Sequence, residues 1–356
     1  MKIGITSLLS RNPWKNRSKQ SATNLYECLQ NLGAEVFYIC NDKNITNFDK
    51  DHRAFHEEDM TKEAAPEMNI LIIHGYQPKE RTLEGLKRKN KDIKIIYHTL
   101  ANPIAKVHEL SRSSEDLLIN YIDEIWLPPH QFEKRNFMGA IFPDKVKIKE
   151  CPFLWSPSFL EEFQRKSKNS NIRYDSKRDR GISILEPNKD FTKNLVLPMS
   201  FTARAVGQSH GLFKNISIFN TKYAKKSGVV QRLYKDIKER LLKDVYLSNE
   251  WDAPDIYARC GQFIVSHQFE NEVNYQYLES LFLDLPLIHN SKTLSSCGYY
   301  YKENNPIHAS SQIVNAGLNH AKNLNYYREE SRKLILSYSP SLASNMNKLA
   351  ELINSK

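Results

Sequence analysis

The feature that most constrains the fold of this chain is a regular alternation of short apolar runs with amphipathic stretches. In the first half, apolar runs of strand length are separated by segments with helical spacing. These runs lie at residues 2–6, 36–40, 69–74, 93–98 and 124–127. Parallel strands need a crossover between them, which is usually a helix. The alternation therefore predicts an α/β fold with a parallel sheet that is covered on both faces.

The alternation restarts near residue 182, after a stretch of basic and small polar residues. We therefore predict two Rossmann-like domains that face each other across a cleft. The predicted limits are 1–160 for the first domain and 181–339 for the second, with a last helix at 340–356 that packs back on the first. Residues 161–180 are predicted to be a solvated basic linker or, alternatively, a basic flap that contacts phosphates.

The composition excludes several classes of protein. The 356 residues include 51 Lys and Arg and 41 Asp and Glu, a formal net charge of +10, which fits either a lysine-rich surface or a polyanionic partner. The five cysteines are scattered without a CxxC pair, as in a reduced cytosolic protein. No run approaches the ~20 apolar residues of a membrane span, and the first residues do not form a signal peptide. We expect a cytoplasmic protein.

Several common catalytic and nucleotide-binding motifs are absent from the sequence. It contains no GxGxxG after the first strand and no GxxxxGK[ST], which disfavours dinucleotide enzymes and P-loop NTPases. It also lacks HExxH, the zinc-binding motif of metalloproteases. We therefore expect a function without a bound metal.

The most informative segment is 263–301, which predicts a strand, a polar loop, a helix, a strand and a polar turn. Its loop, Ser266–Asn271, follows a strand and opens a helix, which is where ligands bind in open α/β sheets. The helix N-terminus offers free N–H groups to an anion. Glu270, Asn271 and Asn274 can bind hydroxyl groups. The loop therefore predicts a site for a ligand with both kinds of group.

Next to this loop, the run Leu278–Pro286 places Glu279 seven residues before a proline. In this spacing the chain resembles the GT-B superfamily of nucleotide-sugar glycosyltransferases. The resemblance implies a GT-B fold and a role for Glu279 in binding ribose hydroxyls, because a carboxylate can accept two hydrogen bonds from a vicinal diol. Superfamily members with paired glutamates place the first one eight residues earlier, where this chain has Asn271 beside Glu270.

A second resemblance covers most of the chain. Its motifs are EPN at 186–188 followed by Lys193, SHQFEN at 266–271 followed by Asn274, PLIHNS at 286–291 and GYYY at 298–301. They are similar to motifs of a family of predicted glycosyltransferases from bacteria and tailed phages. The resemblance implies a nucleotide-sugar donor, with a UDP-sugar favoured, and no metal requirement. Lys193 would offset charge on the leaving nucleotide. The other donor-binding residues it implies are Asn188, His267, Gln268, Asn290 and Ser291.

The predicted strand at 94–98 points to a catalytic base. It resembles in place the segment of T-even phage DNA β-glucosyltransferases that carries an acidic base. That class has an aspartate there, whereas this chain has none between His98 and Lys106. An inverting enzyme needs a carboxylate or an imidazole near the acceptor hydroxyl. We therefore predict His98 as the base, followed by His74 and Glu109.

The loop at 10–20 (SRNPWKNRSKQ) suggests the acceptor, because it follows the first strand and interleaves basic residues with a tryptophan. This composition suits phosphate contacts and stacking on a base. The residues expected to contact DNA are Arg11, Trp14, Lys15, Arg17 and Lys19. We therefore predict duplex DNA as partner, with the target base extruded into a pocket.

Three hypotheses for the function follow. The first is a monomeric glycosyltransferase that moves a sugar to hydroxymethylcytosine in phage DNA, with arabinose favoured over glucose. The second keeps the same donor site but uses a cell-surface glycan or a lipid-linked acceptor. The third is a non-catalytic nucleic-acid-binding protein on a GT-B scaffold, which would not bind a nucleotide sugar.

Overall fold

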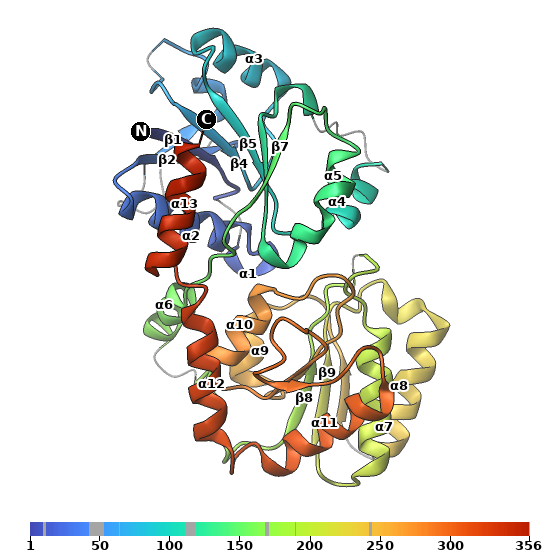
Figure 1. The fold of residues 1–356 in the computed structure, drawn as a ribbon. Helices are drawn as coiled ribbons and strands as arrows, with labels where there is room; N and C mark the ends of the chain where they lie inside the picture. Colours follow the sequence, from blue (N-terminus) through green and yellow to red (C-terminus); the bar gives the residue numbers. More distant parts are fainter. Residues whose placement is uncertain are drawn as a thin grey trace. The chain divides into compact units, whose positions relative to one another are not determined.

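The computed structural model describes residues 1–9, 12–42, 53–63, 65–111, 118–167, 171–188, 190–241 and 244–355. The chain divides into two compact units. Unit 1 comprises Met1–Ser156 and Tyr338–Lys356, and unit 2 comprises Pro157–Ser337 (Figure 1). Within the described ranges, no helix has the length and apolar character needed to cross a membrane.

Unit 1 contains a seven-stranded parallel sheet in the order β3-β2-β1-β4-β5-β6-β7. Its strands are β1 (Lys2–Thr6), β2 (Glu35–Cys40), β3 (Ala54–His56), β4 (Ile70–Ile73), β5 (Lys94–His98), β6 (Glu124–Leu127) and β7 (Lys147–Glu150). Strand β4 is apolar and buried along its whole length, as expected for a strand covered on both faces. Two hydrophobic clusters supply that cover, one containing Ile72 and Leu25 and the other Leu71 and Leu83.

The helices of unit 1 include the end of the chain. They are α1 (Pro13–Asn16), α2 (Ser18–Asn31), η2 (Glu57–Asp59), α3 (Glu80–Lys89), α4 (Pro103–Leu110), η3 (Ile119–Tyr121), η4 (Pro129–Lys134), α5 (Arg135–Gly139) and α13 (Ala343–Asn354). Helix α13, red in Figure 1, lies against α2. Leu349 and Leu352 of α13 share a buried cluster with Leu25 and Leu29 of α2, so the last helix completes the core of unit 1.

Unit 2 contains a six-stranded parallel sheet in the order β10-β9-β8-β11-β12-β13. Its strands are β8 (Gly181–Ile184), β9 (Asn215–Ile218), β10 (Asp244–Leu247), β11 (Phe263–Val265), β12 (Leu287–His289) and β13 (Tyr299–Tyr300). Its helices are α6 (Ser158–Lys166), α7 (Val196–Gln208), η5 (Ala224–Lys226), α8 (Gly228–Leu241), α9 (Ala253–Arg259), α10 (Tyr275–Phe282), α11 (Pro306–Asn319) and α12 (Leu324–Leu336). The central strands β8 and β11 are fully buried, which fixes the position of the loops that follow them.

The segment 161–180, predicted to be a solvated linker, is instead part of unit 2. It begins inside α6, and Ile172 is fully buried. The guanidinium of Arg178 donates to the carbonyl oxygens of Tyr257 (3.0 Å) and Cys260 (2.7 Å). A basic composition alone does not distinguish a solvated arginine from one that satisfies backbone carbonyls, because the guanidinium suits both.

Candidate active site

Each sheet reverses its strand order at one point, between β1 and β4 in unit 1 and between β8 and β11 in unit 2. Ligands of open α/β sheets bind beyond the carboxyl ends of the strands at such a point. In unit 2 the chain leaves β8 and β11 through the loops that carry Asn188 and His267. In unit 1 the chain leaves β4 at His74, and His98 ends the neighbouring strand β5. Each unit therefore carries polar residues at its own switch point.

In unit 2, the loop after β8 buries the carboxyl group of Glu186, the first residue of the EPN motif, to which the sequence alone assigns no role. Glu186 is fully buried, and its Oε1 accepts hydrogen bonds from the hydroxyl of Ser266 and from the N–H of His267 (3.3 Å). Its Oε2 has no hydrogen-bond partner among the described residues. Burial raises the pKa of Glu186 to about 7, although the Ser266 hydroxyl and the positive charge of Lys193 oppose this shift.

Lys193 and Asn188 lie on opposite sides of a closed loop. The N–H of Asn188 donates to the carbonyl oxygen of Lys193 (3.0 Å), and Asn188 has a left-handed φ of 52°. This loop is tied to the one after β11, because the N–H of Phe269 donates to the carbonyl oxygen of Thr192 (2.9 Å). The two loops at the switch point therefore form one hydrogen-bonded surface.

The loop after β11 leaves two buried amide atoms without partners. The amide of Asn271 donates to Oε1 of Gln268 (3.3 Å), but its Oδ1 is buried and makes no hydrogen bond within the described chain. Asn274 caps α10 by accepting the N–H of Tyr277 (3.0 Å), and its Nδ2 likewise has no partner there. Glu270 is exposed, with a left-handed φ of 52°. Buried polar atoms are rarely left unpaired, so this loop has the features of a ligand site.

Three other predicted donor residues, Gln268, Asn290 and Ser291, hold two loops together. Asn290 and Gln268 form a reciprocal pair: the N–H of Gln268 donates to Oδ1 of Asn290 (3.0 Å), and Nδ2 of Asn290 donates to the carbonyl oxygen of Gln268 (2.8 Å). The hydroxyl oxygen of Ser291 accepts the N–H of Leu294 (3.1 Å). These bonds fix the turn after β12 against the β11 loop.

His267 and Glu279 are more deeply placed. The hydroxyl of Tyr301 donates to the carbonyl oxygen of Ser266 (2.8 Å), so Nδ1 of His267 is the donor in its 2.8 Å contact with that hydroxyl. Burial lowers the pKa of His267 to about 4. Glu279, in α10, is fully buried and accepts a hydrogen bond from the hydroxyl of Tyr257 (2.9 Å).

In unit 1, the structure brings two of the predicted catalytic residues together. Nδ1 of His74 lies 3.1 Å from Nδ1 of His98, and Nε2 of His74 lies 2.6 Å from the hydroxyl of Ser21 in α2. Burial lowers the pKa of His74 to about 4 and holds that of His98 well below its usual value, with the neighbouring His74 adding to the second shift. Nε2 of His98 is buried and lacks a partner in the part of the chain that is described.

Glu109, the third candidate base, is not part of this arrangement. Its side chain is 70% exposed on α4 and forms an ion pair with Lys106 at 3.0 Å. Glu109 lies in the second turn of α4, so its side chain is on the surface of that helix and not at the end of β5.

The predicted DNA-contacting loop is described in part. Arg11 and the side chain of Lys15 lie outside the described residues. Asn12 caps α1 by accepting the N–H of Trp14 (2.9 Å). Arg17 has a left-handed φ of 60°, and its guanidinium donates to the carbonyl oxygen of Trp14 and lies 6.0 Å from the indole ring. The carbonyl oxygen of Lys19 accepts the hydroxyl of Thr23 (3.0 Å).

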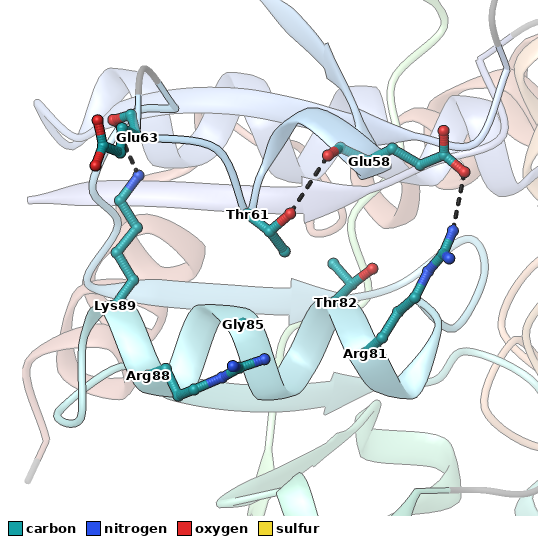
Figure 2. A pocket seen from close by; sticks show the side chains of 8 residues that line it. All are labelled: Glu58, Thr61, Glu63, Arg81, Thr82, Gly85, Arg88 and Lys89. Atoms are coloured by element: carbon teal, nitrogen blue, oxygen red, sulfur yellow. Dashed lines mark hydrogen bonds and ion pairs between the residues drawn. The ribbon is translucent and has the colours of Figure 1, made fainter.

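A separate cavity of about 830 Å³ lies in unit 1 between η2 and α3 (Figure 2). Figure 2 shows charged side chains that already bind one another or the backbone: Arg81 pairs with Glu58 at 3.0 Å, and Lys89 donates to the carbonyl oxygen of Glu63 (3.3 Å). The cavity is not lined by His74 or His98. No group of three or more His, Cys, Asp or Glu in the described ranges is arranged to hold a metal ion.

The sequence alone assigned no role to Glu186, although it lies in the EPN motif, and did not mark Ser21. The position of Glu186, two residues after a buried strand and before Pro-Asn, is a signal that could have selected it. Ser21 lies inside α2, 53 residues from His74 in the sequence, and no motif marks it.

Solved structures show where this fold occurs elsewhere. An alpha-glucosyltransferase (AGT) in complex with UDP matches with a TM-score of 0.65 and 13% identity over 100% of both chains. An alpha-glucosyltransferase in complex with UDP and a 13-mer DNA containing an HMU base matches with 0.63 and 13% identity, covering 100% of this chain and 99% of that one. T4 phage BGT in complex with UDP-glucose matches with 0.55 and 12% identity, over 99% of this chain and 100% of that one. These similarities confirm the predicted α/β GT-B fold.

Curated proteins contain no match to this chain. A family model does match, over residues 3–353, which is nearly the whole length. The chain therefore belongs to the family described as "Protein of unknown function (DUF2827)".

Proposed function

We propose that this protein is a glycosyltransferase that moves a sugar from a nucleotide-sugar donor, a UDP-sugar, to an acceptor hydroxyl. The observation that carries the proposal is the group of buried polar atoms at the switch point of unit 2 that have no hydrogen-bond partner among the described residues, on a fold shared with UDP-binding glucosyltransferases. They include Oε2 of Glu186, Oδ1 of Asn271 and Nδ2 of Asn274. Such atoms are costly unless a ligand or water pairs with them.

Unit 2 would bind the donor. The ammonium of Lys193, whose charge already acts on Glu186, offsets the negative charge on the leaving diphosphate. The amides of Asn271 and Asn274 bind sugar hydroxyls. Glu279, which accepts a hydrogen bond from the hydroxyl of Tyr257, takes the ribose hydroxyls, because a carboxylate can accept two hydrogen bonds from a vicinal diol.

Unit 1 would supply the base. Burial keeps the ring of His98 neutral near pH 7, and its Nε2 is the atom without a partner in the described structure. As the acceptor oxygen attacks the anomeric carbon, its proton passes to Nε2 of His98. The bond between the anomeric carbon and the phosphate oxygen breaks, and UDP leaves with that electron pair. This step requires neither a metal nor a covalent intermediate.

For the acceptor, we propose hydroxymethylcytosine in duplex DNA. The support is the net charge of +10, the neighbouring Trp14 and Arg17, and the DNA in the complex of a structural neighbour. Arabinose is favoured over glucose as the sugar, and the enzyme would act as a monomer in the cytoplasm of a phage-infected host.

The test is incubation of the full chain with hydroxymethylcytosine DNA and a panel of UDP-pentoses and UDP-hexoses, with and without EDTA. Nucleoside mass spectrometry should detect one added sugar, equally in both buffers. An added pentose would support arabinose as the transferred sugar, whereas an added hexose would support glucose instead. Transfer to a glycan or a lipid-linked acceptor, but not to DNA, would refute the proposal that DNA is the acceptor. DNA binding without binding of any nucleotide sugar would refute the proposal that the protein is a glycosyltransferase.

A further inference from the structure

Three polar side chains of unit 1 form a continuous hydrogen-bonded line that ends at one open atom. The hydroxyl of Ser21 lies 2.6 Å from Nε2 of His74, and Nδ1 of His74 lies 3.1 Å from Nδ1 of His98. At the far end, Nε2 of His98 is buried and has no hydrogen-bond partner within the described ranges. The line connects a helix, α2, with the ends of two neighbouring strands.

The backbone holds this line in place. The N–H of His74 donates to the hydroxyl of Thr6 (2.9 Å), which itself donates to the carbonyl oxygen of Tyr76 (2.7 Å). The ring of His98 lies edge-on to Trp126, with 6.1 Å between the ring centroids. Strands β1, β4, β5 and β6 are neighbours in the sheet, so these anchors belong to one rigid layer. The two rings therefore keep their facing orientation.

Two neutral rings that face each other through their Nδ1 atoms allow only two proton arrangements. In one, Nδ1–H of His98 donates to His74, and Nε2–H of His74 donates to Ser21. In the other, every donor is reversed, and His98 carries its proton on Nε2. The arrangement therefore decides whether the open atom of His98 is a lone pair or an N–H group.

Ser21 favours the first arrangement. Its hydroxyl oxygen lies 3.1 Å from the carbonyl oxygen of Ser18, to which it donates. A hydroxyl has one proton, so a Ser21 that donates to Ser18 must accept from Nε2–H of His74. The reversed arrangement would lose that bond and would also leave Nε2–H of His98 buried without an acceptor, which is the rarer kind of orphan. The first arrangement has three hydrogen bonds and the second has two.

We propose that Ser21 and His74 are positioning residues that hold His98 with a bare Nε2, ready to accept a proton. This inference rests on the proposed function, in which that atom takes the proton of the acceptor hydroxyl. After the transfer, His98 carries protons on both nitrogens and keeps its hydrogen bond to Nδ1 of His74. Ser21 and His74 touch no substrate in this scheme and act only through His98.

The test is long-range ¹H–¹⁵N correlation NMR on the full chain with ¹⁵N-labelled histidine and no added ligand. We expect His98 to be protonated on Nδ1 and His74 on Nε2. In Ser21→Ala the line loses its terminal acceptor, and the two rings should populate both arrangements. The matched control is Thr23→Ala, which removes a hydroxyl from the same helix that contacts Lys19 and Tyr38 but neither histidine. Wild-type His98 protonated on Nε2, or an unchanged spectrum in Ser21→Ala, would overturn the proposal.

Kinetics separate this proposal from the function on which it rests. With an active donor and acceptor, Ser21→Ala should lower kcat about tenfold to a hundredfold and leave the KM for the donor unchanged, whereas Thr23→Ala should match the wild type. An unchanged kcat in Ser21→Ala would overturn the positioning role. If no donor gives transfer while the NMR pattern is as expected, the glycosyltransferase proposal fails and the proton arrangement stands, because the spectrum does not depend on activity.

Discussion

The switch points of the two units differ in how they satisfy their polar groups. In unit 1, His74 and His98 belong to a line of hydrogen bonds that ends at one open atom, Nε2 of His98. The hydroxyls of Ser7 and Tyr76, which follow β1 and β4, are also buried without partners among the described residues, but they are not part of this line. In unit 2, the loops after β8 and β11 leave several buried atoms open, on Glu186, Asn271 and Asn274. A single open atom on a fixed ring suits the transfer of one proton. Several open atoms on one surface suit the binding of a ligand with many polar groups.

Replacing His98 with Asn should have the largest effect and separate the two roles. The variant loses the lone pair of Nε2, so kcat should fall about a thousandfold. Its affinity for UDP should not change, because the proposed donor residues all lie in unit 2. Transfer assays and calorimetric titration with UDP measure the two quantities. The control is Glu109→Gln, which removes an exposed ion pair with Lys106 and should retain wild-type kcat. Loss of activity in the control but not in His98→Asn would identify Glu109 as the base.

The next largest effect concerns the pH dependence of stability in unit 2. The pKa of Glu186 is raised from 4.5 to about 7 in the folded state, which therefore holds this proton more tightly than the unfolded chain. The free energy of unfolding should fall by about 3 kcal/mol as pH rises from 4.5 through 7, and stay at the lower level above that. Glu186→Gln should remove this fall.

Denaturant unfolding at pH 5 and pH 8 measures the effect. The difference in unfolding free energy between Glu186→Gln and the wild type should increase from the lower to the higher pH. The exposed Glu250→Gln, in the same unit, is the control and should follow the wild type at both values. If the unfolding free energies of Glu186→Gln and the wild type change by the same amount between the two pH values, this carboxyl is not held protonated by burial.

A smaller effect is expected at the ligand surface of unit 2. Asn271→Ala removes the open Oδ1 and the bond to Gln268, so the KM for the donor should rise about tenfold while kcat changes little. Steady-state kinetics with varied donor tests this. The control is Gln312→Ala, which removes an amide whose hydrogen bonds within the described residues are to His308 and Asn315 of its own helix. An unchanged KM in Asn271→Ala would remove this residue from the donor site.

The sequence predicted the elements of both switch points better than their contacts. Alternating apolar runs are enough to predict two parallel sheets, because the period of the pattern and the crossover rule are local properties. They also place His74 and His98 at the ends of neighbouring strands. By contrast, the contact of Ser21 with His74 depends on how α2 is rotated against the sheet, which no short pattern encodes.

The unit 2 residues show the same limit. The burial of Glu186 depends on Ser266 and His267, which are 80 and 81 residues away and approach it only when β8 and β11 pair. The basic stretch at 161–180 was misjudged for a related reason. Its charges can be read from the sequence. The carbonyl oxygens of Tyr257 and Cys260 that Arg178 binds, however, lie at the end of α9, and only the folded chain brings them next to Arg178.

The smallest expected effect tests whether unit 1 also contacts DNA. Arg17 is held beside Trp14 by its bond to the Trp14 carbonyl oxygen, a geometry that presents a cation next to a flat ring. If Arg17 neutralises one phosphate, Arg17→Ala should reduce the slope of log affinity against log salt by about 0.9. Arg232→Ala removes the same charge from an exposed position on α8 of unit 2 and should leave the slope unchanged. Equal slopes for the two variants would mean that the charge acts through the overall field of the protein. In that case the segment before α2 would no longer be assigned as the DNA contact. The catalytic role proposed for unit 1 would then rest on His74 and His98 alone.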